Sequence, residues 1–242
     1  MTFCLGIKVR SGLVALADTR ITSGTNTTTS KKITTHQIGN NSMFLMTSGL
    51  RSVRDKALTY FEEALDEKDF SYNKLYKAVN AFGDQLRRVA KEDKEALQQA
   101  GLYFNLHTIV GGQLADDATH KLFLLYPEGN WIEIGEATPF AIIGNTGFGQ
   151  PILNRALTFE SSLRFSLKTG FLSFDSTRVS ASDVGYPLDI VIYKQDSFEM
   201  IEQRFSYEEL QNISSEWSEM LQEAVTKLPE NWMDHLLDPM NE

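Results

Sequence analysis

The second residue of the chain, Thr2, is of a type that can act as a nucleophile from the N-terminus. An initiator methionine is generally removed when the next residue is as small as threonine. Removal of Met1 would give Thr2 a free α-amine beside its hydroxyl. An N-terminal threonine that uses its own amine as the base is a recognised arrangement for attack on a carbonyl carbon. Removal of Met1 would therefore make Thr2 a candidate nucleophile, provided that the rest of the chain supplies the other parts that it needs.

Three further residues have the types that such a nucleophile needs. A threonine hydroxyl is a weak acid. A nearby lysine ammonium lowers the cost of ionising it, and an aspartate can hold that lysine in place. A backbone N–H at a glycine commonly stabilises the oxyanion that forms after the attack. The sequence offers Asp18, Lys32 and Gly49 for these roles. Their spacing alone leaves a plain structural interpretation open, because aspartates at strand ends and lysine pairs at solvated strand edges are common.

The elements predicted around these residues place each of them at the end of a strand. Alternating apolar residues predict two strands joined by a turn at Gly12, and such a hairpin returns Asp18 toward Thr2. Lys32 ends a polar segment that we expect to be a loop, and Gly49 follows the fourth strand. The elements predicted in this part are strands at 2–9, 13–17, 33–38 and 42–47 and a loop at 19–32.

The remaining elements follow in runs rather than in strict alternation. Such runs favour antiparallel sheets with segregated helices, an α+β layered fold. No internal repeat or linker interrupts the chain, so we expect a single domain over residues 1–242, with residues 228–242 as a C-terminal tail. Periodicity and turn residues predict helices at 53–65, 75–89 (fraying within 91–99), 151–167 and from 206 onward, and strands at 104–110, 121–126, 131–134, 139–143, 188–193 and 198–205.

Composition excludes several classes of function. The net charge of −9 argues against a nucleic-acid partner, because phosphate binding needs a basic surface. No segment is long and apolar enough for a membrane span, and the first residues do not have the pattern of a signal peptide, so we expect none. Cys4 is the one cysteine, which fits a reducing cytosol. The four histidines are scattered without ligand spacing, so we expect no metal site.

Longer motifs around these residues resemble those of proteasome β-subunits, and more narrowly those of the bacterial homologue family called Anbu, the ancestral β-subunits. In that family, too, a threonine directly follows the start methionine. The resemblance covers roughly residues 2–226 and implies the four-layer αββα sandwich of N-terminal-nucleophile hydrolases. The motifs that carry it are Gly12-Leu-Val-Ala-Leu-Ala-Asp18-Thr-Arg20, Lys31-Lys32-Ile33, Thr47-Ser48-Gly49, Gly144-Asn-Thr-Gly-Phe-Gly149-Gln-Pro151-Ile-Leu-Asn-Arg155, Asp175-Ser176-Thr177 and Val184-Gly185-Tyr-Pro187-Leu-Asp189.

The resemblance also assigns roles to single residues. It implies that Thr2 is nucleophile and base, that Lys32 lowers the pKa of its hydroxyl, that Asp18 orients Lys32, and that Gly49 donates the oxyanion N–H. Asp175 matches an aspartate that supports the N-terminal amine. Two serines that accompany it in the family match less cleanly here. Thr146 or Asn145 holds the first position, and Ser180 stands near the second, where Arg178 occupies the spacing of the family.

Three hypotheses about function follow. The leading one is a threonine-type peptidase that acts on peptides or unfolded proteins without metal or organic cofactor, inside a ring or open spiral of self-associated subunits. A second is an N-terminal-nucleophile amidase for a small non-peptide amide. A third is a catalytically weak assembly or binding protein that keeps the fold and the oligomer. The first two require the removal of Met1, because a retained methionine leaves Thr2 with an amide nitrogen that cannot act as a base.

Overall fold

The computed structural model describes residues 2–23, 26–66 and 72–237 of the 242-residue chain. By its internal contacts the chain divides into two units, Met1–Ser206 and Tyr207–Glu242. The expectation of one domain over the whole chain stays a prediction.

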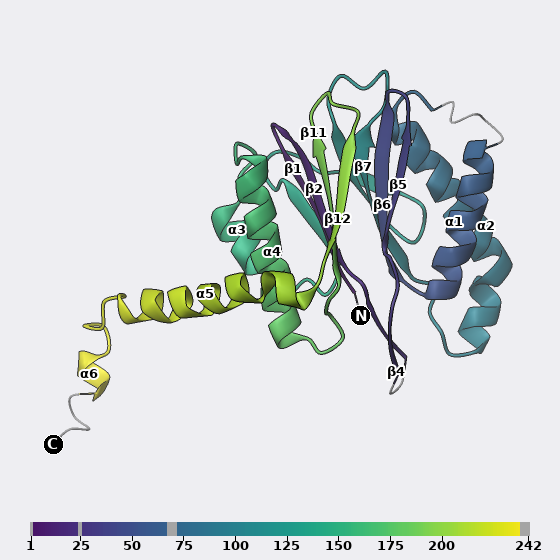
Figure 1. Ribbon diagram of the computed structural model, residues 1–242. Helices are drawn as coiled ribbons and strands as arrows, with labels where there is room; N and C mark the ends of the chain where they lie inside the picture. Colours follow the sequence, from purple (N-terminus) through teal and green to yellow (C-terminus); the bar gives the residue numbers. More distant parts are fainter. Residues whose placement is uncertain (1, 24–25, 67–71, 238–242) are drawn as a thin grey trace. The chain divides into compact units, whose positions relative to one another are not determined.

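The first unit is a sandwich of two five-stranded antiparallel sheets with a pair of helices on each outer face (Figure 1). The first sheet has the order β10-β1-β2-β11-β12 and the second the order β5-β6-β7-β8-β9. The four-layer αββα fold is therefore confirmed. Its elements are β1 (Phe3–Val9), β2 (Gly12–Asp18), β5 (Ile33–Ile38), β6 (Asn41–Gly49), α1 (Arg51–Asp66), α2 (Leu75–Gln99), β7 (Leu106–Gln113), β8 (Lys121–Leu125), β9 (Trp131–Glu133), β10 (Phe140–Gly144), α3 (Gln150–Ala156), α4 (Leu163–Ser180), β11 (Leu188–Lys194) and β12 (Met200–Phe205).

Apolar layers between the two sheets and on their outer faces hold the first unit together. Between the sheets, Cys4 and Ala15 of the first sheet pack with Phe44 and Ile109 of the second. On the outer face of the second sheet, the apolar stripes of α1 and α2 pack against it, and Phe82 is among the fully buried side chains. Every residue of β1 and of β2 is buried, because both faces of the first sheet are covered. This rigid packing fixes the positions at which the central strands end.

The polar segment predicted as a loop contains a small hairpin of β3 (Arg20–Ser23) and β4 (Asn26–Thr29). Its threonines are β-branched and favour a ladder even without an apolar face, so the prediction of a loop was wrong here. Helix α2 also continues without fraying to Gln99, because its last two turns consist mostly of strong helix formers.

The helix predicted at 151–167 is two helices in the structure. Helix α3 ends at Ala156, and α4 begins at Leu163 after Ser162, whose hydroxyl oxygen accepts a hydrogen bond from the N–H of Phe165 at 3.2 Å. Periodicity continued across the break and concealed it, whereas the N-cap serine was the signal for a new start.

The second unit contains α5 (Tyr207–Thr226) and the short α6 (Asp234–Leu237). The helix predicted from the capping residues at 206–209 is confirmed as α5. None of its residues is buried, although Ile213, Met220 and Val225 are apolar. Among the described residues, no helix has the length and apolar character to cross a membrane.

Candidate active site

The β1–β2 hairpin brings Asp18 beside the start of the chain. In its register Cys4 lies opposite Ala17, so Asp18 lies level with Phe3. The backbone N–H of Phe3 donates a hydrogen bond of 2.9 Å to Oδ1 of Asp18. The predicted return of Asp18 toward the N-terminus is therefore confirmed, and Thr2 is the residue next to this contact.

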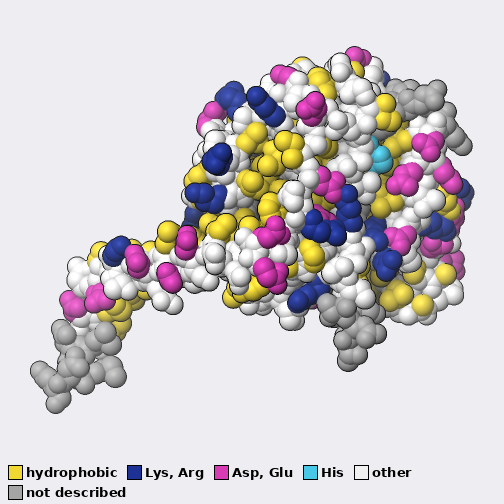
Figure 2. Space-filling model, viewed as in Figure 1, with side chains coloured by type: hydrophobic (Ala, Val, Ile, Leu, Met, Phe, Trp, Pro, Cys, Tyr) yellow, Lys and Arg dark blue, Asp and Glu magenta, His cyan; other side chains and the backbone are white. Residues whose placement is uncertain are grey.

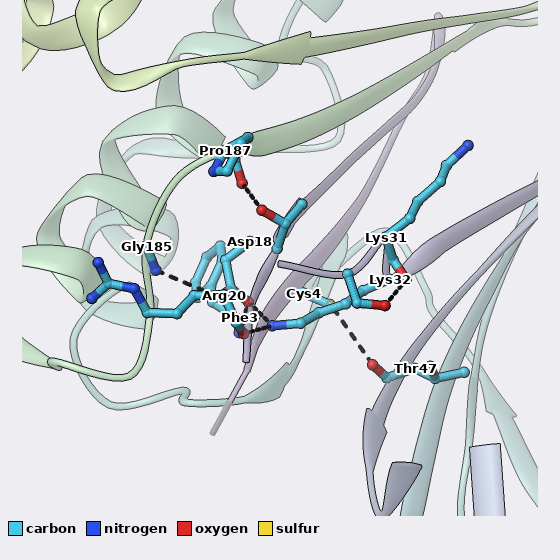
Figure 3. A network of polar contacts seen from close by, with 11 residues as sticks. Phe3, Cys4, Asp18, Arg20, Lys31, Lys32, Thr47, Gly185 and Pro187 are labelled. Carbon is cyan, nitrogen blue, oxygen red and sulfur yellow. Dashed lines mark hydrogen bonds and ion pairs between the residues drawn. The ribbon is translucent and has the colours of Figure 1, made fainter. Parts of the chain in front are cut away.

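Lys32 joins the same group from the other sheet, because it lies directly before β5. Its Nζ donates hydrogen bonds to Oδ1 of Asp18 at 2.6 Å and to the carbonyl oxygen of Arg20 at 2.8 Å (Figure 3). Asp18 has no exposed surface and the Lys32 side chain is 4% exposed, so this ion pair is shielded from water. Lys31 points away from the group in Figure 3 and forms an exposed ion pair with Glu202. The structure thus distinguishes the two adjacent lysines.

The loop before β11 completes the surroundings of Asp18. The N–H of Gly185 points to Oδ2 of Asp18 at 3.4 Å, and the Thr19 hydroxyl donates to the carbonyl oxygen of Pro187 at 2.7 Å. Burial raises the pKa of the Asp18 carboxyl above its usual value, whereas the Lys32 ammonium and the N–H donors oppose that rise. The ion pair with Lys32 therefore offsets part of the cost of burying this carboxylate.

A cavity of about 660 Å³ lies over this group, and its lining includes Thr2, Lys32, Gly49 and Thr146. Four residues that the sequence singled out thus meet in one cavity. Gly49 has a φ of +150°, and a Cβ there would lie 2.0 Å from the carbonyl oxygen of Asn105. Only glycine fits such a position, where the strand ends against a neighbouring backbone.

The backbone of Thr2 is fixed by the end of β10. Gly144 has a φ of +89°, and a Cβ at this position would lie 1.9 Å from the Thr2 carbonyl oxygen. The N–H of Asn145 donates a hydrogen bond of 2.7 Å to that same oxygen. These contacts hold the first residues of the chain in the sheet, in contrast to the fraying that is usual at a terminus.

Two of the singled-out residues lie elsewhere. Among the described residues that line the cavity, neither Asp175 nor Ser180 is present. Asp175 is buried on α4, where Arg178 donates hydrogen bonds of 2.7 and 3.1 Å to its Oδ1. Ser180 is the last residue of α4 and is exposed. Helix α4 still contacts the start of the chain, because the rings of Phe174 and Phe3 lie 6.0 Å apart.

Cys4 belongs to the packing of the site. It is fully buried between the sheets, and its Sγ lies 3.9 Å from the carbonyl oxygen of Thr47. Burial raises the pKa of the Cys4 thiol well above its usual value, so the reactive thiolate is disfavoured. Cys4 therefore acts as a small apolar residue behind the cavity.

The positive charge of the cavity was not predicted from the sequence. Arg20, Arg51 and Arg54 also line the cavity, and the last two lie in the first turn of α1. In the helix predicted at 53–65, Arg54 lies off the apolar face, which is typical of a solvated side chain. The available signal was the start of α1, where no acidic residue stands and two arginines do.

Comparisons with known proteins agree with this architecture. The family model described as "Proteasome subunit" matches residues 2–161. The structure of an Anbu (Gly-1) mutant from Hyphomicrobium sp. strain MC1 is 34% identical, with a TM-score of 0.87, and the match covers 95% of this chain and 99% of that chain. Comparison with curated proteins finds no match.

Two further structures are similar over nearly the same length. Anbu from Yersinia bercovieri is 26% identical with a TM-score of 0.86, and the match covers 94% of this chain and 97% of that one. A structure described as the helical assembly of the Anbu complex from Pseudomonas aeruginosa has the same identity, TM-score and coverage. The family match, the sandwich and its resemblance to the Anbu structures lead to one conclusion: the chain belongs to the proteasome-subunit family and is built like its Anbu members.

Proposed function

We propose that the chain is a threonine-type hydrolase of peptide or amide bonds whose nucleophile is Thr2, exposed by removal of Met1. The observation that carries the proposal is the buried Lys32, whose ammonium is held by Asp18 and by the Arg20 carbonyl while the residue lines the same cavity as Thr2. A lysine shielded from water stabilises a neighbouring alkoxide more strongly than an exposed one.

In the proposed reaction the α-amine of Thr2 takes the proton of the Thr2 hydroxyl, and the hydroxyl oxygen attacks the carbonyl carbon of the substrate. The Gly49 N–H stabilises the oxyanion of the tetrahedral intermediate. The C–N bond then breaks, and the leaving amine takes the proton from the Thr2 ammonium. Water attacks the resulting ester, again with the amine as base, and restores Thr2. Thr2 and water carry every proton of this cycle, so it requires no metal or organic cofactor.

We assign supporting roles to three further residues. Thr146 lines the cavity and follows Asn145, which holds the Thr2 carbonyl, so we place it beside the reacting end of the chain. Asp175 and Ser180 keep the role that the family resemblance implies, support of the N-terminal amine. For these two, the contact of α4 with Phe3 supports only a position near the start of the chain.

We further propose that the protein self-associates, acts on peptides or unfolded proteins, and works in the cytosol. Apolar residues of α5, among them Met220 and Val225, are exposed to water in the single chain. This exposure supports the proposal that a second copy of the chain packs against them. The helical assembly formed by the Pseudomonas aeruginosa relative agrees with this. A single buried cysteine fits a reducing compartment. Light scattering coupled to size-exclusion chromatography tests the self-association, and a monomer at all concentrations contradicts it.

The test of the reaction starts with the intact mass of the purified protein, which shows whether Met1 has been removed. Protein without Met1 should hydrolyse peptides that carry a fluorogenic amide, and the Thr2→Ala variant should lose this turnover. Thr2→Ser keeps a hydroxyl and an amine and should retain part of the activity. Equal turnover by the wild type and Thr2→Ala contradicts the proposal.

The same assay separates the alternatives. A panel of peptides and small non-peptide amides is offered to the protein, and hydrolysis of the small amides alone identifies an amidase instead of a peptidase. No turnover of any probe by protein lacking Met1 leaves the assembly protein as the remaining hypothesis. We expect the same turnover in buffer with and without EDTA, because the proposed cycle needs no metal ion.

A further inference from the structure

The lining of the cavity carries positive charge without acidic residues. Its described residues include four cationic side chains and no aspartate or glutamate: Arg20, Lys32, Arg51 and Arg54. The chain as a whole has a net charge of −9, and acidic and basic side chains lie interspersed on the face shown in Figure 2. The cavity therefore differs in charge from the rest of an acidic protein.

Two carboxylates outside the lining form ion pairs with three of these four cations. Lys32 is paired with Asp18. Arg51 and Arg54 share Asp55, at 3.3 Å and 2.7 Å. Arg20 donates to the carbonyl oxygen of Ser182 at 2.7 Å, and within the described part of the chain no carboxylate lies within ion-pair distance of it. The pairing thus leaves positive charge at the cavity uncompensated.

The two arginines of α1 add to this imbalance by their position. The N-terminal end of a helix carries partial positive charge, so cations in the first turn are unfavourable and acidic residues are preferred there. Helix α1 has no acidic residue in its first turn, and Arg51 and Arg54 face the cavity from that end. An anionic group in the cavity would relieve this repulsion. The side chain of Arg54 is only 14% exposed, so solvent screens it less than that of Arg51, which is 66% exposed.

We propose that the cavity selects substrates with a carboxylate side chain on the residue that supplies the scissile carbonyl, and that Arg54, aided by Arg51, recognises this carboxylate. The assignment rests on the proposed role of Thr2 and Gly49. Gly49 is proposed to bind the carbonyl oxygen, and Arg51 follows it by only two residues. The substrate residue that bears this carbonyl is therefore the part nearest the arginines. A glutamate or aspartate side chain at this position of the peptide would lie near the positive charge of the arginines and would be attracted to it.

The test compares two probes that differ in one charge, an acetylated peptidyl-glutamyl aminocoumarin and its glutaminyl counterpart. We expect kcat/KM to be at least tenfold higher for the glutamyl probe with the wild type. The Arg51→Gln/Arg54→Gln double variant should bring this ratio near one. The Asp55→Asn variant removes the shared carboxylate and should raise the ratio. Arg88→Gln, a matched change of an exposed arginine on α2, should leave the ratio unchanged.

A binding experiment separates this inference from the proposed function. Rhodamine-labelled peptides with glutamate or glutamine at the same position are titrated into Thr2→Ala protein, and anisotropy is followed at low and high salt. Preferred binding of the glutamyl peptide that weakens in salt and in the arginine double variant supports the inference, even if no turnover is found. Equal binding of both peptides, or a ratio of kcat/KM that the double variant does not change, overturns it even if Thr2 proves to be the nucleophile.

Discussion

Replacing Asp18 by asparagine tests the buried ion pair on which the candidate site depends. An asparagine has the same shape as aspartate, and its Oδ1 can still accept from the N–H of Phe3 and from Nζ of Lys32 at the distances that Asp18 shows, 2.9 and 2.6 Å. The change therefore removes the charge and, among these hydrogen bonds, only the 3.4 Å contact of the Gly185 N–H with Oδ2. Lys32 would then be a buried ammonium whose remaining partners, among the described residues, are neutral oxygens.

The size of the effect follows from this burial. Breaking a buried pair by removing one partner costs about 3–5 kcal/mol. An upper bound of similar size comes from releasing the proton of Lys32, because neutralising an ordinary lysine at pH 7 costs about 4–5 kcal/mol. We therefore expect the Asp18→Asn variant to lose about 3–5 kcal/mol of unfolding free energy at pH 7, and to lose its activity.

The assay is urea unfolding followed by circular dichroism, at one protein concentration because self-association adds to apparent stability. A double-mutant cycle adds Lys32→Met and the double variant Asp18→Asn/Lys32→Met. The double variant holds no buried charge at these two positions and should be more stable than either single variant. The exposed pair of Lys121 and Glu133, 2.8 Å apart, supplies the control, and Lys121→Met should cost no more than about 1 kcal/mol.

The pH dependence gives a second signature. As the pH rises from 7 to 9, a lysine becomes easier to neutralise by about 1.4 kcal/mol per pH unit, so the deficit of Asp18→Asn should narrow. Additive losses in the double variant, or a deficit that does not change with pH, would refute the idea that Asp18 and Lys32 form a charge-compensated buried pair.

Three other predictions concern the pH response, the start of the chain and the core. Burial lowers the pKa of His120, and its Nε2–H donates a hydrogen bond of 2.8 Å to a backbone carbonyl oxygen. The neutral form therefore contributes stability that is present above the ordinary histidine pKa of about 6.5 and is lost as the pH falls through the lower folded pKa. His120→Gln should make the free energy of unfolding in urea less sensitive to a change from pH 7 to pH 5, and an unchanged sensitivity contradicts this. Gly144→Ala places a Cβ against the Thr2 carbonyl oxygen and should abolish turnover, whereas Gly147→Ala, with no atom within 4 Å of its Cβ, should be tolerated; equal activities of the two variants would contradict the role given to the end of β10. Phe82→Ala opens a cavity in the fully buried layer between the second sheet and its helices and should cost about 3–5 kcal/mol in the same unfolding assay, and a cost below 1 kcal/mol would show that this layer is not tightly packed.

Local patterns in the sequence were enough for the elements whose formation depends on neighbouring residues. The turn at Gly12 and the apolar alternation around it predicted the β1–β2 hairpin, and with it the position of Asp18 level with Phe3. The capping residues before Tyr207 predicted α5. The same local reasoning failed at 151–167, where helical periodicity runs across the boundary between α3 and α4.

Motif resemblance went further than local patterns and named the fold and several of the cavity residues. The αββα sandwich is confirmed, and Thr2, Lys32, Gly49 and Thr146 line one cavity. The resemblance assigned roles to these residues but did not predict the hydrogen bonds and ion pairs that position them. For example, the backbone carbonyl oxygen of Arg20 accepts a hydrogen bond from Lys32. Arg20 belongs to one of the motifs, but no sequence pattern shows that its backbone would be an acceptor.

The sequence by itself therefore determined which residue types stand at the strand ends, because strand alternation and turn residues act over a few positions. Only the tertiary structure decided what surrounds them. Gly185 reaches Asp18 across 167 positions of sequence, and Lys32 reaches it from the opposite sheet. Such contacts depend on the register of the strands and on how closely the two sheets pack, which many distant side chains set together. The positive charge of the cavity arises for the same reason, since α1 begins where β6 ends beside the start of the chain.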